Sequence, residues 1–119
     1  MATTSYRDLT QTVSRQLCTL RTSTPDVMKA FSDLGRAATA DGVLDKKTKE
    51  LIALALSVAV RCDPCIGFHT QALVKLGATR QELDETLGVA TYMGGGPSLM
   101  YAAAAVTAFD EFAAAAKAG

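Results

Sequence analysis

The chain has 119 residues, and its 12 Lys and Arg side chains balance its 12 Asp and Glu side chains, so its formal net charge is zero. Hydrophobic residues make up 49% and charged residues 20% of the sequence, which predicts a folded core and excludes an intrinsically disordered chain. The length is that of one domain, which we expect to extend over residues 1–119. Because the sequence has neither a basic excess nor a basic stripe, we do not expect nucleic acid as a partner.

The sequence carries no recognisable signal for export or for a membrane. Its first residues, MATTSYRD, lack the apolar segment of a secretory leader. The stretch 86–109 is uncharged and long enough to span a bilayer, but Gly94-Gly95-Gly96-Pro97 breaks it in the middle. The 3 cysteines are an odd number, which argues against a framework of disulfides. We therefore expect a cytoplasmic protein without a membrane partner, whose thiols are structural, metal-binding or redox-active.

Helix signals follow one another along the first half of the chain. A weak amphipathic pattern covers residues 6–20. Thr24-Pro25 then provides an N-cap and an N1 proline for a helix that ends at Asp41-Gly42. Asp45 caps the next helix, which reaches about position 61. Its segment 51–60 is apolar almost all round, so we expect this helix to be central and buried.

The second half continues the pattern, and no segment alternates like a strand. Asp63-Pro64 supplies another N-cap and N1 proline, for a helix over about 64–76 that stops at Gly77. A capping box, 79–82, opens a helix that runs to the triple glycine, and an Ala-rich helix starts near Pro97. We predict an all-α bundle of about five to six helices. We also expect a homo-oligomer, because one small chain is hard pressed to cover so much apolar surface.

The chemically most informative segment is CDPCIGFH at 62–69, a C-x-x-C-x-x-x-H pattern that contains the only histidine of the chain. With Pro64 at N1, Cys65 lies in the first helical turn, where unpaired N–H groups and the helix dipole favour an anion such as a thiolate. His69 follows one turn later on the same face and can take the thiol proton. Cys62 is close enough to form a local disulfide with Cys65. These parts predict a two-thiol redox site.

Other interpretations of the same residues stay open. The cysteines could be small buried hydrophobic residues, and we favour this structural interpretation for Cys18, which is alone in its segment. Cys62, Cys65 and His69 could instead bind zinc, with Cys18 or Glu50 as a fourth ligand. His69 could be a satisfied core histidine, and Glu50 could act only as a carboxylate that stabilises the start of its helix.

The pattern resembles a known family. Glu50, Cys62, Cys65 and His69, followed by a helix and a Gly-rich break with a proline, resemble the carboxymuconolactone decarboxylase superfamily. The paired cysteines are similar to those of its alkylhydroperoxidase D-like (AhpD-like) branch, whereas the decarboxylases proper do not depend on them. The resemblance covers about residues 41–109 and is sharpest from Glu50 to His69.

This resemblance implies a role for each matching residue. Cys65 would be the peroxidatic cysteine, Cys62 would resolve its sulfenic acid by forming the disulfide, and His69 with Glu50 would form a proton relay. The implied enzyme is an AhpD-like thiol peroxidase that reduces hydroperoxides, draws electrons from an external dithiol, needs no cofactor or metal, and forms a homotrimer or homohexamer. Where the fuller family pattern has a histidine between the cysteines, this chain has Asp63-Pro64.

Two rival functions keep the same fold. A lactone decarboxylase would need an acid–base site and no redox thiols, and a non-enzymatic zinc-binding or assembly module would need no reaction at all. A simple antiparallel hairpin would also leave Glu50 and His69 roughly 10 Å apart, so a bend, a crossing angle or a neighbouring subunit must join them. The side chains Phe68, Tyr92, Met93 and Met100 could line a pocket for an organic hydroperoxide, but we expect them to belong to the core.

Overall fold

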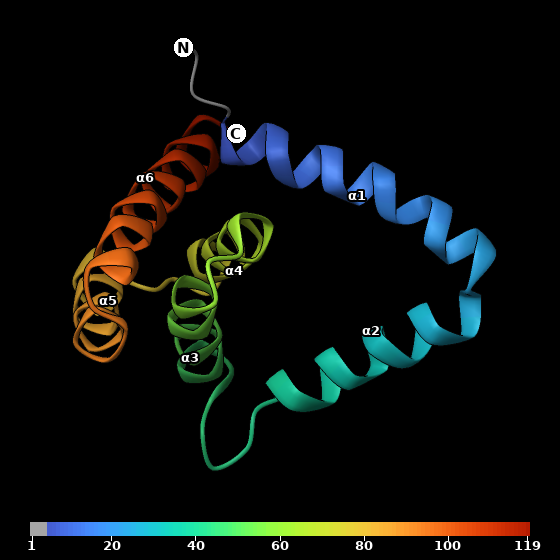
Figure 1. Cartoon of the computed structure of the whole chain (residues 1–119), viewed down its shortest axis with the longest axis horizontal. Helices are drawn as coiled ribbons and strands as arrows, with labels where there is room; N and C mark the ends of the chain where they lie inside the picture. Colours follow the sequence, from blue (N-terminus) through green and yellow to red (C-terminus); the bar gives the residue numbers. More distant parts are fainter. Residues whose placement is uncertain (1–4) are drawn as a thin grey trace.

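The computed structural model describes residues 5–119, and within that range it consists of helices without any strand (Figure 1). The helices are α1 (Tyr6–Ser23), α2 (Pro25–Thr39), α3 (Lys46–Ala59), α4 (Asp63–Lys75), α5 (Arg80–Gly94) and α6 (Gly96–Ala118). This confirms the predicted all-α fold and its number of helices. The expected absence of an export signal concerns residues 1–4 in part, and these lie outside the described residues.

Capping side chains begin two of the helices where the sequence predicts them. The Asp45 side chain accepts a hydrogen bond from the Thr48 N–H, and Thr79 forms a complete capping box with Glu82. The prediction for α4 is off by one residue: the helix begins at Asp63, and its N-cap is Cys62.

The end of α3 explains why α4 begins early. The Arg61 N–H donates to the Val58 carbonyl at 3.2 Å and the Cys62 N–H donates to the Ser57 carbonyl at 3.0 Å, the two hydrogen bonds of a Schellman motif. This motif needs a residue in the left-handed region, and Arg61 occupies it with φ 60° where glycine is usual. The chain thus changes direction within residues 60–62. Cys62 follows the end of α3 and is the N-cap of α4.

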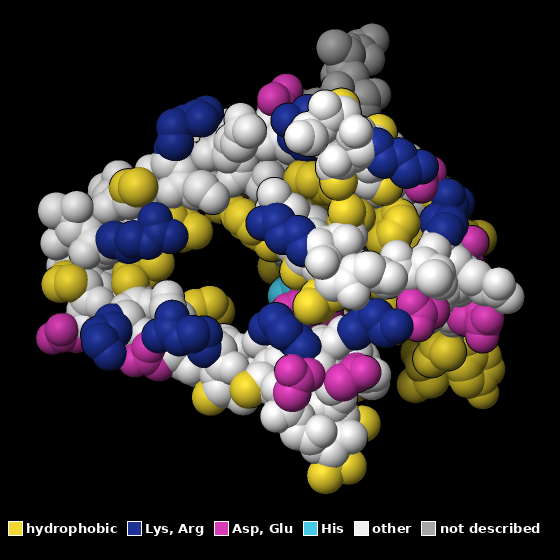
Figure 2. All heavy atoms as spheres, turned by 180° about the vertical axis from the view of Figure 1, so that it is seen from behind, with side chains coloured by type: hydrophobic (Ala, Val, Ile, Leu, Met, Phe, Trp, Pro, Cys, Tyr) yellow, Lys and Arg dark blue, Asp and Glu magenta, His cyan; other side chains and the backbone are white. Residues whose placement is uncertain are grey.

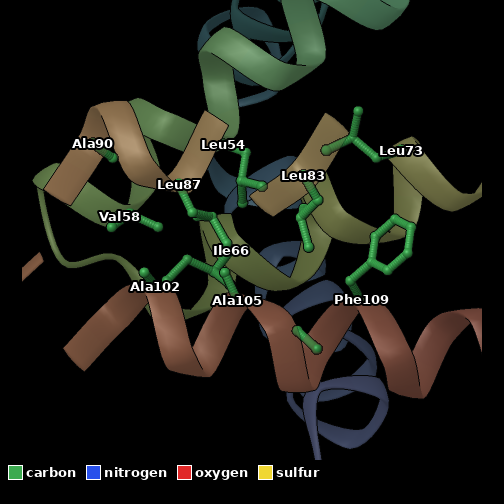
Figure 3. Close-up of a cluster of buried hydrophobic side chains, with 11 residues drawn as sticks. Leu54, Val58, Ile66, Leu73, Leu83, Leu87, Ala90, Ala102, Ala105 and Phe109 are labelled. Carbon is green, nitrogen blue, oxygen red and sulfur yellow. The ribbon is translucent and has the colours of Figure 1, made fainter. Parts of the chain in front are cut away.

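Helices α3 to α6 enclose the hydrophobic core (Figure 3). Leu54, Ile66, Leu73 and Leu83 are fully buried in it. Small side chains let α6 approach closely, and its core face consists of Ala102, Ala105, Ala108, Phe109 and Phe112. By length and composition alone α6 is apolar enough to cross a membrane, but in the bundle it packs against α4 and α5. The predicted break in the uncharged stretch falls between α5 and α6, at Gly95.

Helix α1 begins against α4 and α6, and α1 and α2 then form an arm that leaves the core and returns to it at α3 (Figure 1). No residue of α2 is buried, and the Phe31 side chain is 70% exposed. Helix α3 is also not buried all round, because Leu56 and Val60 are 60% and 69% exposed although Leu54 and Val58 are fully buried. Within the described chain, the expectation of a central and buried helix is therefore confirmed for the face with Leu54 and Val58 and wrong for the face with Leu56. An apolar run predicts burial without telling whether the covering surface belongs to the same chain.

Candidate redox site

The two cysteines of the predicted redox motif are joined by a disulfide at the start of α4. Cys62 is the N-cap and Cys65 is the third helical residue, and their Cα atoms are 5.2 Å apart. The Cys65 N–H donates a hydrogen bond to the Cys62 Sγ at 3.3 Å. Both residues are partly buried. Cys65 therefore lies in the first turn, as predicted, but the backbone donor of that turn points at the sulfur of Cys62.

Few backbone donors remain free in this turn. Pro64 has no N–H, and the Ile66 N–H already donates to the Cys62 carbonyl at 2.9 Å. The Cys65 N–H is the donor that reaches a sulfur. The positive end of the helix dipole adds to it, because it favours negative charge within the first turn.

Glu50 and His69 meet across α3 and α4. The His69 Nδ1 and the Glu50 Oε2 are 2.6 Å apart, the Glu50 side chain is only 8% exposed, and the imidazole is 32% exposed. A carboxylate on one ring nitrogen fixes the orientation of the imidazole, so the other nitrogen is left to exchange protons. His69 lies one turn after Cys65 on α4, and the spacing places both on one side of the helix.

The gap expected between Glu50 and His69 is bridged within one chain. Helix α3 ends at position 59, so Glu50 lies about 14 Å before the junction, and His69 lies about 9 Å beyond the start of α4. The remaining difference of about 5 Å is within the reach of the two side chains. No neighbouring subunit is needed to form this pair.

Cys18 takes no part in the site. It is exposed on α1, where its Sγ lies 3.5 Å from the Ser14 carbonyl oxygen and 3.6 Å from the Arg21 Nη1. The structural interpretation that favoured burial of Cys18 is therefore wrong, since the helix presents this side chain to solvent. Within residues 5–119 no group of three or more His, Cys, Asp or Glu side chains is arranged to hold a metal ion.

Three of the four residues considered for a substrate pocket lie on the surface of the described chain. Tyr92, Met93 and Met100 are 84%, 75% and 64% exposed, near the junction of α5 and α6. The expectation that they belong to the core is therefore wrong. Phe68 is partly buried on α4 and lines a different surface hollow, formed with α1.

One contact at the cysteine motif has no signal in the sequence. The Tyr6 hydroxyl of α1 donates to the Asp63 Oδ1 at 3.1 Å, and these residues are 57 positions apart. Burial, and then the hydrogen bond to Asp63, raise the pKa of Tyr6 well above its usual range. Only the packing of α1 on α4 brings this phenol to the residue between the cysteines.

These observations define a class: small all-α proteins in which a C-x-x-C motif opens a helix and a Glu–His pair lies one turn away. The chain belongs to the carboxymuconolactone decarboxylase family, whose model matches residues 25–108.

Two solved structures and one further relative support this assignment. A carboxymuconolactone decarboxylase family protein of Legionella pneumophila is 61% identical, with a TM-score of 0.89 over 91% of this chain and 96% of that chain. A family member from Thermotoga maritima, described as a candidate for a role in the antioxidative response, is 33% identical, with a TM-score of 0.82 over 92% of this chain and 94% of that one. An uncharacterized protein of Cupriavidus necator is 43% identical over 108 residues, which cover 91% of this chain and 96% of the relative.

Proposed function

We propose that the protein is an AhpD-like thiol peroxidase that reduces hydroperoxides with the Cys62–Cys65 pair. One observation carries this proposal: a disulfide closes at the N-terminus of α4, one turn from an imidazole that a nearly buried carboxylate orients. Structural disulfides are rare in reducing compartments, whereas a pair of this kind at a helix start is suited to repeated oxidation and reduction.

The proposed cycle has four steps. His69, oriented by Glu50, accepts the proton of the Cys65 thiol. The thiolate attacks the terminal oxygen of a hydroperoxide, the O–O bond breaks, and the leaving alkoxide takes a proton to give an alcohol, or water when the substrate is hydrogen peroxide. The Cys62 thiol then displaces water from the Cys65 sulfenic acid and forms the disulfide. Finally, an external dithiol is oxidised to its own disulfide as it returns both cysteines to thiols.

The comparisons support this assignment in a general way. The Thermotoga relative is described in terms of an antioxidative response, which is compatible with peroxide removal. Sulfur supplies the redox chemistry, so the proposal calls for no cofactor or metal. A reducing dithiol also fits the proposed cytoplasmic location, with neither a membrane nor a nucleic acid as partner.

The proposal includes a homotrimer or homohexamer. Large side chains of the arm and of the α5–α6 junction have no cover within the described chain. Among them are Val27, Phe31, Leu34, Tyr92 and Met93, which are 64–84% exposed. Figure 2 shows an opening between the arm and the bundle, with hydrophobic side chains along part of its edge. Light scattering should give three or six times the chain mass of 12.4 kDa, and Phe31→Asp should lower it. A monomer at high concentration would contradict this part of the proposal.

A thiol titration tests the reaction itself. The reduced protein is mixed with hydrogen peroxide or an organic hydroperoxide, alkylated, digested and analysed by mass spectrometry. The wild type should lose two thiols per peroxide and yield one peptide in which Cys62 and Cys65 are joined by a disulfide and carry no alkyl group. Cys65→Ser should not consume peroxide, whereas Cys62→Ser should consume one equivalent and accumulate a sulfenic acid that a dimedone probe traps.

The same variants separate the proposal from its rivals. Full turnover by Cys65→Ser in the presence of dithiothreitol would disprove the mechanism. If a carboxylated lactone is converted at an unchanged rate after both cysteines are alkylated, the protein is a lyase instead.

A further inference from the structure

We propose that Tyr6 is a positioning residue of the cysteine pair: its phenol holds the Asp63 carboxylate toward α1 and so reserves the Cys65 N–H for the sulfur of Cys62. The inference rests on the proposed dithiol function, but it concerns the acidity of one thiol and not the peroxide reaction. It assigns a role to Tyr6, which lies 57 positions before Asp63 in the sequence.

Asp63 is the natural competitor for that N–H. An aspartate side chain readily accepts a hydrogen bond from the backbone N–H two residues later, and the residue two after Asp63 is Cys65. A carboxylate is an ionised oxygen acceptor and binds such a donor strongly. Pro64 offers no N–H of its own, so a freed Asp63 carboxylate has the Cys65 N–H as its nearest backbone donor.

In the structure Asp63 is engaged elsewhere. Its Oδ1 accepts from the Tyr6 hydroxyl at 3.1 Å, and the Cys65 N–H donates to the Cys62 Sγ at 3.3 Å. The two hydrogen bonds are thus present together at the first turn of α4. Without the hydrogen bond from Tyr6, the Asp63 carboxylate is free to compete with the Cys62 Sγ for the Cys65 N–H.

Tyr6 is well fixed for this task. Its backbone N–H and that of Arg7 donate to the two carboxylate oxygens of Glu111 on α6, at 3.0 and 3.1 Å. A Cβ at Gly67 would lie 3.4 Å from the Tyr6 Cδ1, so the ring packs directly on α4 beside the motif. The start of α1 is therefore hydrogen-bonded to α6 and packed on α4.

The phenol stays a donor over the physiological pH range. Asp63 on α4 and Tyr101 and Glu111 on α6 act on the phenol electrostatically, and all of them oppose its ionisation. Together with burial they keep the pKa of Tyr6 above its usual range, so the hydroxyl retains its proton while the cysteines and His69 change state.

The test measures the acidity of the Cys62 thiol in a chain that has no other cysteine. In a chain carrying Cys18→Ser and Cys65→Ala, the second-order rate of alkylation by iodoacetamide is measured against pH, which reports the acid dissociation constant of Cys62. The Cys65→Ala change keeps the backbone N–H. Into this parent chain we introduce Tyr6→Phe, Asp63→Ala, both together, and Tyr92→Phe as a control that removes an exposed phenol.

Tyr6→Phe keeps the ring against Gly67 and should lower the acid dissociation constant of Cys62 about two- to fivefold, the effect of an exposed charge at a helix terminus. The double variant should return to the parent value or exceed it, and neither Asp63→Ala alone nor Tyr92→Phe should lower the constant. An unchanged constant in folded Tyr6→Phe would overturn the proposal. So would a double variant that resembles Tyr6→Phe, because the effect would then come from packing.

Asp63→Ala keeps the test decisive if Tyr6→Phe does not fold, since a lowered constant in Asp63→Ala would also refute the competition. No peroxide or reductant is present in this assay. Failure of the peroxidase proposal would therefore leave the alkylation result interpretable, and failure here would leave the peroxidase proposal standing.

Discussion

Replacing Glu50 by glutamine removes the charge that orients His69 and almost nothing else. The amide has the shape of the carboxylate and can still accept a hydrogen bond through its oxygen. The Glu50 side chain is only 8% exposed, so little water is available to replace the lost charge. The proposed relay then predicts a slower oxidation of Cys65 in a protein that remains folded.

The size of the effect follows from the contact itself. The distance of 2.6 Å between the His69 Nδ1 and the Glu50 Oε2 is that of a short hydrogen bond to a charged group. Such bonds contribute about 1.5–3 kcal/mol. If the reaction loses this amount when the imidazole takes up the thiol proton, the rate falls about 10- to 150-fold, since about 1.4 kcal/mol corresponds to a factor of ten.

The assay is a rapid-quench measurement of peroxide-dependent disulfide formation in the reduced protein. Glu85→Gln, the same change at an exposed position on α5, serves as the matched control and should react like the wild type. His69→Gln should lose as much as Glu50→Gln, and the double variant should lose little more, because the two residues act as one unit. A rate for Glu50→Gln within twofold of the wild type would refute the relay and leave Glu50 a purely structural role.

Three further substitutions test the surroundings of the site. Gly67→Ala places a Cβ 2.6 Å from the Thr10 Cγ2. It should lower the free energy of unfolding in urea by up to about 2 kcal/mol, which is the cost of overpacking minus the gain in helix propensity. Thr10→Ser in the same chain should restore the stability. A stabilised Gly67→Ala variant would contradict the close packing. Arg61→Gly should raise that free energy by about 0.5–1 kcal/mol, because relief of the left-handed backbone outweighs the flexibility of glycine, and a lower thermal midpoint would contradict it. Cys18→Ser should leave peroxide-dependent disulfide formation unchanged in the mass-spectrometric assay, whereas its loss would make Cys18 the resolving thiol.

The helix boundaries could be predicted because their signals are local. Asp45 and Thr79 bond to N–H groups of the next turn, so a short stretch of sequence contains the whole interaction. The start of α4 differs by one residue because Arg61 takes the left-handed position that closes α3. In α4 the same motif uses Gly77, with φ 77°, and that end was predicted closely from the glycine. An arginine in this position carries no comparable signal.

Burial and long-range contacts depend on packing that no local pattern contains. Thr24-Pro25 predicts the start of α2 correctly, yet the apolar side chains Val27 and Phe31 of this helix are exposed in the described chain. The pairing of Glu50 with His69 depends on how α3 meets α4, and the resemblance suggested the pair before geometry could. The contact of Tyr6 with Asp63 depends on the close packing of α1 on α4 at Gly67, where there is no side chain.

The carboxylate of Glu111 ties the two ends of the chain together, since it accepts the first N–H groups of α1 from a position in the last helix. During synthesis the ribosome releases α1 before α6. Ser5 can therefore cap α1 early, whereas the hydrogen bonds from Tyr6 and Arg7 to Glu111 form only after α6 has emerged. A nascent chain already carries both cysteines but lacks the anchored Tyr6. The full chemical environment of the thiols therefore arises only after α6 has been made, and premature termination before position 111 would leave a cysteine pair without it.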